Sequence, residues 1–156
     1  MVIDLRNNPG GYLESSVEVS SIFIEDGVIV YEEGKDGKKQ EYKAEGAATL
    51  GSYPIVVLVN EGSASASEIM AGALQDYKKG PIVGKKTYGK GSVQELDTIG
   101  GGLSLKITIA KWLTPLGRAI NGEGIKPDIE VDLTDDDFKA DRDPQLDKAI
   151  EEINKE

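Results

Sequence analysis

The chain has 156 residues, of which 38% are hydrophobic and 29% charged, a composition typical of one soluble globular domain. It contains no cysteine and no histidine, which excludes disulfides, thiolate nucleophiles and a Ser-His-Asp triad. Residues 128–156 contain 12 acidic and 4 basic residues and so carry −8 of the formal charge of −10. The sequence has no basic stripe that would indicate nucleic-acid binding.

Strand and helix patterns alternate along the first half of the chain. Residues 2–5 predict a short strand that ends at the turn-forming run 7–11, and apolar residues at helical spacing predict a helix from Tyr12 onward. Residues 28–31 and 40–43 flank an Asp-Gly turn and predict a hairpin. The β-branched run 54–59 predicts a central strand buried on both faces, and a helix is predicted over 65–78.

The second half adds a short strand at 81–84, a hairpin around 100–102 and a C-terminal helix that begins at Asp143-Pro144. We expect residues 134–142 to be poorly ordered. The acidic run 135–137 is typical of a solvated charge cluster, so neither a metal site nor a cofactor site is predicted. This order predicts an α/β fold with a mainly parallel sheet and added hairpins. Residues 1–134 are expected to form its core, and residues 135–156 an acidic linker and helix of the same domain.

Residues 60–68 leave the predicted buried strand, turn through small side chains and enter a helix. The free N–H groups of a helix N-terminus stabilise a developing oxyanion, so a serine at this position is suited to acyl transfer. Ser63, Ser65 and Ser67 are equally typical of helix caps, and Glu68 would complete a capping box with Ser65. This pattern alone leaves both interpretations open and favours capping.

Two glycine-containing segments are the other candidates. Lys90 stands between Gly89 and Gly91, a position suited to point into a cleft, where burial would favour the neutral lysine that a base requires. Most such lysines are exposed loop residues, and the spacing of a phosphate-binding loop is missing. The tandem glycines Gly10-Gly11 can turn a backbone N–H toward a ligand, or can form only a tight turn between strand and helix.

Taken together, these segments resemble the carboxyl-terminal processing proteases, also called tail-specific proteases, which are Ser-Lys peptidases. The resemblance extends from residue 2 to about residue 132, and four motifs occur in the family's order. The matching residues are 4–11, 63–68 with 71–76, 89–94 and 124–128. The resemblance implies a ClpP/crotonase-like fold of ββα units.

The resemblance also implies a role for each matching residue. Ser65 matches the nucleophile, and Lys90 matches the general base that takes its proton. Gln94 matches a glutamine that orients the lysine. The backbone N–H groups of Ala66 and Gly11 are the implied oxyanion hole.

From the family we expect an endopeptidase that cleaves near protein C-termini through an acyl-enzyme, with polypeptide tails as substrates. Members carry an N-terminal segment and a PDZ domain ahead of this core, and neither is found in this sequence. By the same resemblance, the parent is expected outside the cytoplasm and associated with a membrane, in the periplasm or at the cell surface. This chain by itself is expected to be soluble. A homo-oligomer formed through an exposed sheet edge or the tail helix is a further expectation.

Two other functions compete with this interpretation. The first is a catalytically dormant truncated core that acts as a dimerisation or scaffold module. An acyl-CoA enzyme of the crotonase type would share the fold and an oxyanion hole, but the acidic tail and the Ser-Lys pairing argue against it.

Overall fold

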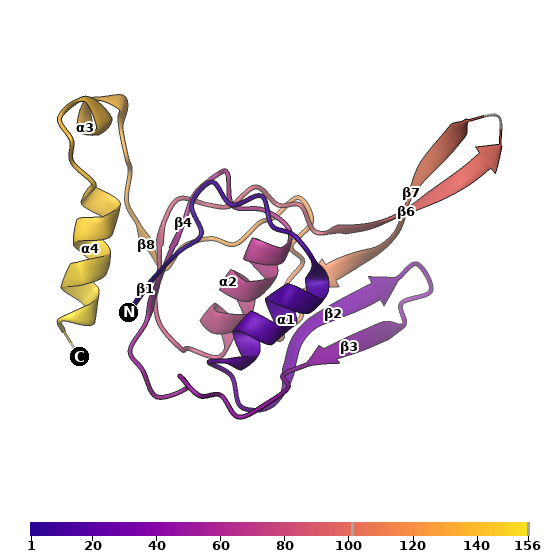
Figure 1. Cartoon of the computed structure of the whole chain (residues 1–156), viewed down its shortest axis with the longest axis horizontal. Coiled ribbons are helices and arrows are strands. Elements are labelled where there is room, and N and C mark those ends of the chain that lie inside the picture. The colour runs from indigo at the N-terminus through magenta and orange to yellow at the C-terminus, as the bar shows by residue number, and fades with distance from the viewer. Residues whose placement is uncertain (101, 156) are drawn as a thin grey trace.

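Two four-stranded sheets and the helices packed on them form the structure, a computed structural model that describes residues 1–100 and 102–155 (Figure 1). The first sheet is parallel, in the order β1-β4-β5-β8, and comprises Val2–Asp4, Val56–Val59, Ile82–Gly84 and Ile129–Glu130. The second sheet is antiparallel, in the order β3-β2-β7-β6, and comprises Lys39–Lys43, Val28–Gly34, Leu103–Leu113 and Ser92–Gly100. The helices are α1 (Leu13–Ser21), α2 (Ala66–Asp76), α3 (Asp135–Lys139) and α4 (Pro144–Ile153).

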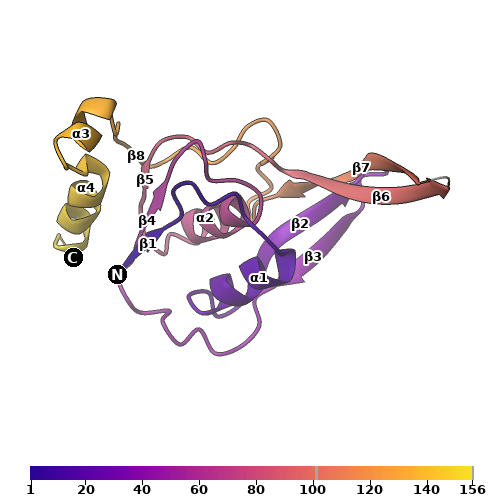
Figure 2. The same cartoon turned by 45° about the horizontal axis from the view of Figure 1, so that its top comes forward.

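Strand β4 lies inside the parallel sheet and is buried on both faces, as its β-branched run predicts. Val57 and Val59 belong to the main core together with apolar residues of α2, whereas Val56 and Leu58 pack in a second cluster with Ala149 of α4. The parallel sheet therefore has α2 on one face and α4 on the other, which is visible after rotation of the molecule (Figure 2). This arrangement confirms the predicted α/β class.

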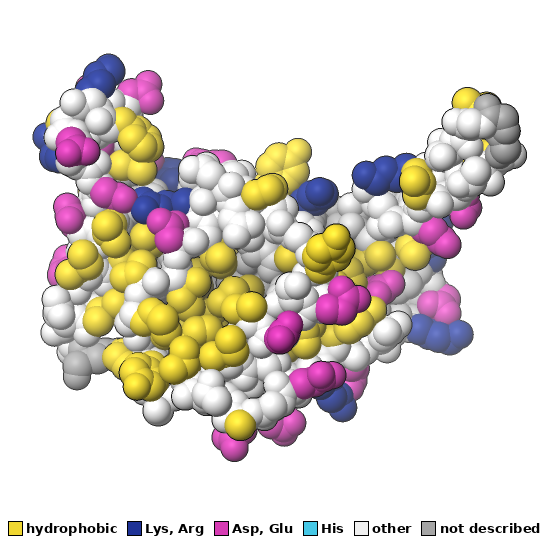
Figure 3. Space-filling view, in the orientation of Figure 1, with side chains coloured by type: hydrophobic (Ala, Val, Ile, Leu, Met, Phe, Trp, Pro, Cys, Tyr) yellow, Lys and Arg dark blue, Asp and Glu magenta, His cyan; other side chains and the backbone are white. Residues whose placement is uncertain are grey.

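Helices α1 and α2 pack against each other and against β2 of the antiparallel sheet. The apolar stripe of α2 is buried, and it shares the main core with Ile29 and Val30 of β2 and Trp112 of β7. Hydrophobic side chains gather on the face of the molecule over β1 and α2 (Figure 3). Helix α2 is thus held between the two sheets with α1 packed beside it, and the loops that precede the two helices are brought together.

The two predicted hairpins are confirmed, but they form a sheet of their own instead of extending the parallel one. Strands β2 and β7 pair antiparallel, with Tyr31 opposite Leu113 and Gly34 opposite Ala110, and this pairing joins the hairpins. The far part of the β6–β7 hairpin projects from the body as a two-stranded arm (Figures 1 and 3). The arm carries exposed apolar residues at Leu96, Ile99, Leu103 and Leu105.

The tail is more ordered than its charge indicates, and the expectation of poor order over 134–142 is wrong. Thr134 accepts a hydrogen bond from the N–H of Asp137, whose carboxylate accepts the N–H of Thr134 in return, so a capping box starts α3. The predicted start of α4 is confirmed, because Asp143 caps it by accepting the N–H of Leu146 at 2.9 Å. Among the helices of the described residues, none is long and apolar enough to cross a membrane.

Candidate active site at the start of helix α2

The three serines of the Ser63–Ser67 run have different environments. Ser63 is fully buried, and its hydroxyl donates to the carbonyl of Leu5 at 2.6 Å and accepts the N–H of Asn60 at 3.0 Å, so it holds the turn. Ser67 is buried within α2. Ser65 is partly exposed and forms the N-cap of α2. Only Ser65 combines exposure with the end of the helix.

Ser65 has an unusual backbone conformation, with φ 57° and ψ −120°. Positive φ is rare for a residue with a side chain, and such a conformation costs on the order of 1–3 kcal/mol. It persists only where surrounding contacts hold it. Strain at one serine between a buried strand and a helix is typical of a functional position.

The turn at residues 7–11 supplies part of this support. Asn7 and Asn60 exchange hydrogen bonds: the N–H of Asn7 donates to Asn60 Oδ1 at 2.8 Å, and Asn60 Nδ2 donates to Asn7 Oδ1 at 3.0 Å. The carbonyl of Asn8 accepts the N–H of Ala64 at 3.0 Å. The two loops that leave β1 and β4 are therefore joined directly beside Ser65.

The tandem glycines Gly10 and Gly11 have distinct roles in this contact. Gly10 has φ +90°, and its N–H donates to Asn8 Oδ1 at 3.0 Å. A Cβ at Gly10 would lie 2.7 Å from the nitrogen of Ala66, so the backbones approach closely because residue 10 has no side chain. Gly11 has no atom within 4 Å of such a Cβ.

The N–H groups of Gly11 and Ala66 have no hydrogen-bond acceptor within the described residues. Both residues line one cavity of about 270 Å³, whose apolar wall includes Leu5, Val19 and Met70. Two N–H groups at the edge of an apolar cavity can together hold a carbonyl oxygen or an oxyanion. The cavity thus combines the two N–H donors implied for the oxyanion hole with room for a neighbouring side chain.

The loop that carries Lys90 packs by its backbone, which explains its glycines. Gly89 has φ +87°, and a Cβ there would lie 3.2 Å from atoms of Gly122 and Gly124. Lys90 itself is exposed, and it lines none of the cavities described in this section. The structure therefore does not confirm the expectation that Lys90 points into a cleft, which stays a prediction. No carboxylate lies within ion-pair distance of Lys90 across residues 1–100 and 102–155.

Gln94 stands on β6, opposite Thr108, and is exposed. Its side chain forms no hydrogen bond to any residue that the structure describes. The structure thus does not bring the amide of Gln94 into contact with Lys90, and the orienting role of Gln94 stays a prediction.

Glu68 joins the segments of Ser65 and Lys90. Its Oε2 accepts the N–H of Ser65 and the N–H of Lys90, each at 2.9 Å. Its Oε1 accepts the hydroxyl of Thr87 at 2.5 Å and the N–H of Gly89 at 2.6 Å. The Ser-x-x-Glu spacing predicts only the capping contact with Ser65, and the contacts with 87–90 required the tertiary structure.

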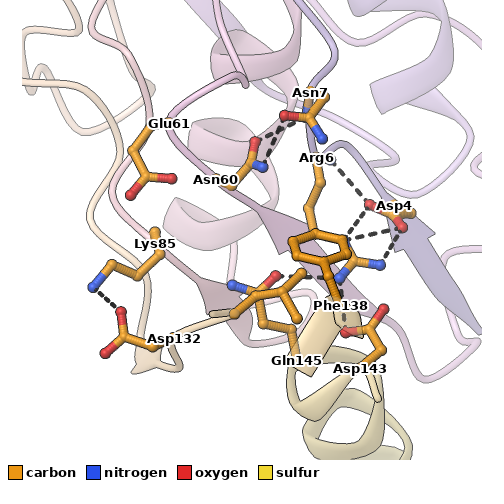
Figure 4. A pocket seen from close by; sticks show the side chains of 11 residues that line it. Asp4, Arg6, Asn7, Asn60, Glu61, Lys85, Asp132, Phe138, Asp143 and Gln145 are labelled. Carbon is orange, nitrogen blue, oxygen red and sulfur yellow. Dashed lines mark hydrogen bonds and ion pairs between the residues drawn. The ribbon is translucent and has the colours of Figure 1, made fainter. Parts of the chain in front are cut away.

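A second cavity, of about 410 Å³, lies at the carboxyl ends of the parallel strands (Figure 4). Arg6 Nη1 donates to Asp143 Oδ1 at 2.9 Å and to Gln145 Oε1 at 3.2 Å, and its Nη2 donates to Asp4 at 2.7 Å. The hydrogen bond from Arg6 lowers the pKa of Asp143. Burial opposes the ionisation of Asp4, but its hydrogen bonds with Arg6 outweigh burial and lower its pKa. These paired charges connect α4 to the parallel sheet.

Lys85 at the same cavity is paired as well, because its Nζ lies 2.6 Å from Asp132 and 3.1 Å from Glu130. These carboxylates raise the pKa of Lys85, which favours its charged form. Lys85 is thus poorly suited to act as a base. Within the described part of the chain, no group of three or more acidic side chains is arranged to hold a metal ion.

Comparisons with known proteins show which family and fold the chain resembles. The model of peptidase family S41 matches residues 1–131. The chain is 48% identical over 134 residues to "Probable CtpA-like serine protease" of Staphylococcus aureus, and 44% identical over 133 residues to the protein of the same name from Staphylococcus epidermidis. These matches cover 85% and 84% of this chain, and the chain spans 27% of each relative.

A solved structure, the photosystem II D1 C-terminal processing protease, superposes with a TM-score of 0.80 at 40% identity. The match covers 84% of this chain and 34% of that chain. The mixed fold with one parallel and one antiparallel sheet is thus shared with a protease of known structure.

Proposed function

The chain belongs to peptidase family S41, and from this premise we propose that it is a serine endopeptidase that cleaves near protein C-termini through an acyl-enzyme. Ser65 is the proposed nucleophile and Lys90 the proposed general base. The observation that carries the proposal is the strained, partly exposed Ser65 at the start of α2, next to two N–H groups that have no acceptor in the described residues. The absence of histidine leaves lysine as the most suitable base for this serine.

The proposed reaction begins when neutral Lys90 takes the hydroxyl proton of Ser65, and Ser65 Oγ bonds to the scissile carbonyl carbon. The N–H groups of Ala66 and Gly11 hold the resulting oxyanion. Lys90 then gives its proton to the leaving nitrogen as the C–N bond breaks, which leaves the acyl-enzyme. Water attacks the ester while Lys90 takes its proton, and return of that proton to Ser65 releases the product acid. Gln94 would orient Lys90 during these transfers.

The apolar cavity supports the placement of substrate. A peptide carbonyl directed at the N–H groups of Gly11 and Ala66 would lie beside Leu5, Val19 and Met70, which offer apolar contact to the adjoining side chain. The photosystem II D1 C-terminal processing protease is named for processing a C-terminus. We propose that this chain likewise cleaves bonds near the C-terminus of its substrates.

Partners and location follow from the same premise. We infer that polypeptide C-terminal tails are the substrates, that a PDZ domain of the parent chain presents them, and that the parent works outside the cytoplasm near a membrane. Homo-oligomer formation belongs to the same set of inferences. Each is supported by family membership and is testable on the longer protein.

Cleavage of a synthetic tail peptide tests the proposal. Because acid–base groups contribute roughly 100-fold to 10,000-fold, Ser65→Ala and Lys90→Ala should each lower kcat/KM at least about 100-fold. Lys86→Ala, at an exposed lysine of the same loop, is the matched control and should stay within about twofold of the parent. A Lys90→Ala variant that cleaves as fast as the parent would refute the mechanism. Equal cleavage of the same sequence placed inside a longer chain, away from its C-terminus, would refute the preference for C-termini.

The exposure of Lys90 favours a second candidate, a catalytically dormant core. Burial is what favours a neutral, proton-accepting lysine, and the side chain of Lys90 is exposed. A dormant core would hydrolyse neither the tail peptide nor its activated ester, whereas an active one would hydrolyse both. The ester is the more sensitive probe because its leaving group needs no proton from Lys90.

A further inference from the structure

Glu68 is a buried charge that the proposed reaction does not use. Its side chain lies on the first turn of α2 and is fully buried. A buried carboxylate is costly unless hydrogen bonds or a cation compensate it. Within the described residues no lysine or arginine pairs with Glu68, so hydrogen-bond donors alone compensate its charge.

The four donors divide evenly between the two oxygens of Glu68. One oxygen accepts the N–H groups of Ser65 and Lys90, and the other accepts the Thr87 hydroxyl and the N–H of Gly89. Only the ionised carboxylate can accept four hydrogen bonds, because a protonated oxygen becomes a donor. Three of the donors belong to the 87–90 segment, whereas the fourth is the backbone of the strained serine.

We propose that Glu68 is a positioning residue whose buried carboxylate fixes the Lys90 loop to the Ser65 turn. The inference rests on the proposed function, since it concerns the separation of the nucleophile from its base. The Glu68 carboxylate accepts no hydrogen bond from either side chain and acts through the two backbones, which share one of its oxygens.

The backbone of Ser65 explains why this link matters for reactivity. Its strained conformation persists because neighbouring contacts hold it, and the hydrogen bond to Glu68 restrains the serine's own N–H. Loss of that bond would let Ser65 relax toward a common conformation and would move its hydroxyl. A displacement of about 1 Å can lower a reaction rate about 100-fold.

Glu68→Gln separates this role from simple filling of space. Glutamine has nearly the same volume, but its amide offers one accepting oxygen and one donating NH2 group. In either orientation two of the four donors would face the NH2 group. When these are the donors of Ser65 and Lys90, the shared contact is lost although the core stays filled. Glu123→Gln removes a charge from an exposed glutamate on a neighbouring loop and serves as the control.

Amide hydrogen exchange of the whole chain and peptide-hydrolysis kinetics test the proposal together. In Glu68→Gln with its NH2 group toward Ser65 and Lys90, we expect exchange at these two N–H groups to accelerate at least about 10-fold, with exchange in β4 unchanged; with the opposite orientation the acceleration falls on Gly89 instead. We expect kcat to fall at least about 100-fold while KM changes less than about threefold. Glu123→Gln should match the parent in every measurement.

Two results would overturn the proposal: exchange in Glu68→Gln that is unchanged at Gly89 as well as at Ser65 and Lys90, or accelerated exchange at Ser65 and Lys90 with kcat retained. If the parent hydrolyses nothing while Glu68→Gln still frees both amides, the proposed function fails and the structural link stands. If Glu68→Gln does not fold, Thr87→Val is the alternative variant. It removes the hydroxyl that donates to Glu68 Oε1 and keeps the contacts of Oε2 with the N–H groups of Ser65 and Lys90. That variant should keep protection at Ser65 and Lys90 and lose less than about 10-fold in kcat. A larger loss with both amides protected would refute the proposal.

Discussion

A methyl group at Gly10 should damage the site, whereas the same group at Gly11 should be tolerated. Gly10 has φ +90°, and a Cβ there would lie 2.5 Å from the carbonyl oxygen of Ala64 and 2.9 Å from Cβ of Ser65. Gly11 has no atom within 4 Å of the corresponding position. Because both substitutions keep the backbone N–H, the pair separates loop packing from loss of a donor.

The expected energies follow from these contacts. The left-handed conformation costs alanine roughly 1–2 kcal/mol, and forced overlap in a packed region adds about 1–3 kcal/mol. Gly10→Ala should therefore lower the free energy of unfolding by roughly 2–5 kcal/mol. At about 2–4 °C per kcal/mol for a chain of this size, Tm should fall by roughly 4–20 °C. Gly11→Ala should change the free energy by less than about 1 kcal/mol, through reduced freedom of the unfolded chain.

Thermal unfolding and peptide hydrolysis of the two variants measure these effects. In Gly10→Ala the turn must move away from Ser65, so kcat should fall at temperatures where the variant is still folded. Gly11→Ala should keep Tm near that of the parent. A Gly10→Ala variant as stable and active as Gly11→Ala would refute the inferred packing of this turn on the serine.

Two titrations test other parts of the structure. Hydrogen bonding to Arg6 lowers the pKa of Asp143. The stability that ionised Asp143 contributes is therefore present above its unfolded pKa of about 3.9 and is lost as pH falls through its lower folded pKa. Asp143→Asn should flatten this part of the acid-unfolding curve. Burial and the hydrogen bond to Glu32 raise the pKa of Tyr42 to about 12. The stability that neutral Tyr42 contributes is therefore lost as pH rises from about 10, the unfolded pKa, through about 12. A late step in the phenolate absorbance should disappear in Tyr42→Phe, and its persistence would contradict the assignment.

Local patterns predicted most elements of the fold because their signals are short-range. The β-branched run before Asn60 indicated a strand buried on both faces, and Asp143-Pro144 indicated a helix start; both are confirmed. The joining of the hairpins depends on pairing between β2 and β7, far apart in sequence, which strand propensity does not encode. Residues 134–142 were expected to be poorly ordered, yet a capping box and the ion pair between Asp137 and Arg142 order α3.

The site was predictable only in part, for a similar reason. The motifs indicated Ser65 as a helix cap, and the structure distinguishes it from Ser63 by burial. The glycines beside Lys90 were interpreted as directing the lysine into a cleft, whereas they permit close backbone packing on residues 120–124. Glu68 appeared as the second half of a capping box, because its three contacts with 87–90 join segments about 20 residues apart.

The central claim is that Ser65 becomes acylated. Incubation with a tail peptide carrying an activated ester, followed by acid quenching and mass spectrometry of peptides from the chain, locates the acyl group directly. The account predicts the added mass on Ser65, and its loss together with hydrolysis in Ser65→Ala. An adduct on another residue, or hydrolysis by Ser65→Ala at the parent rate, would contradict it.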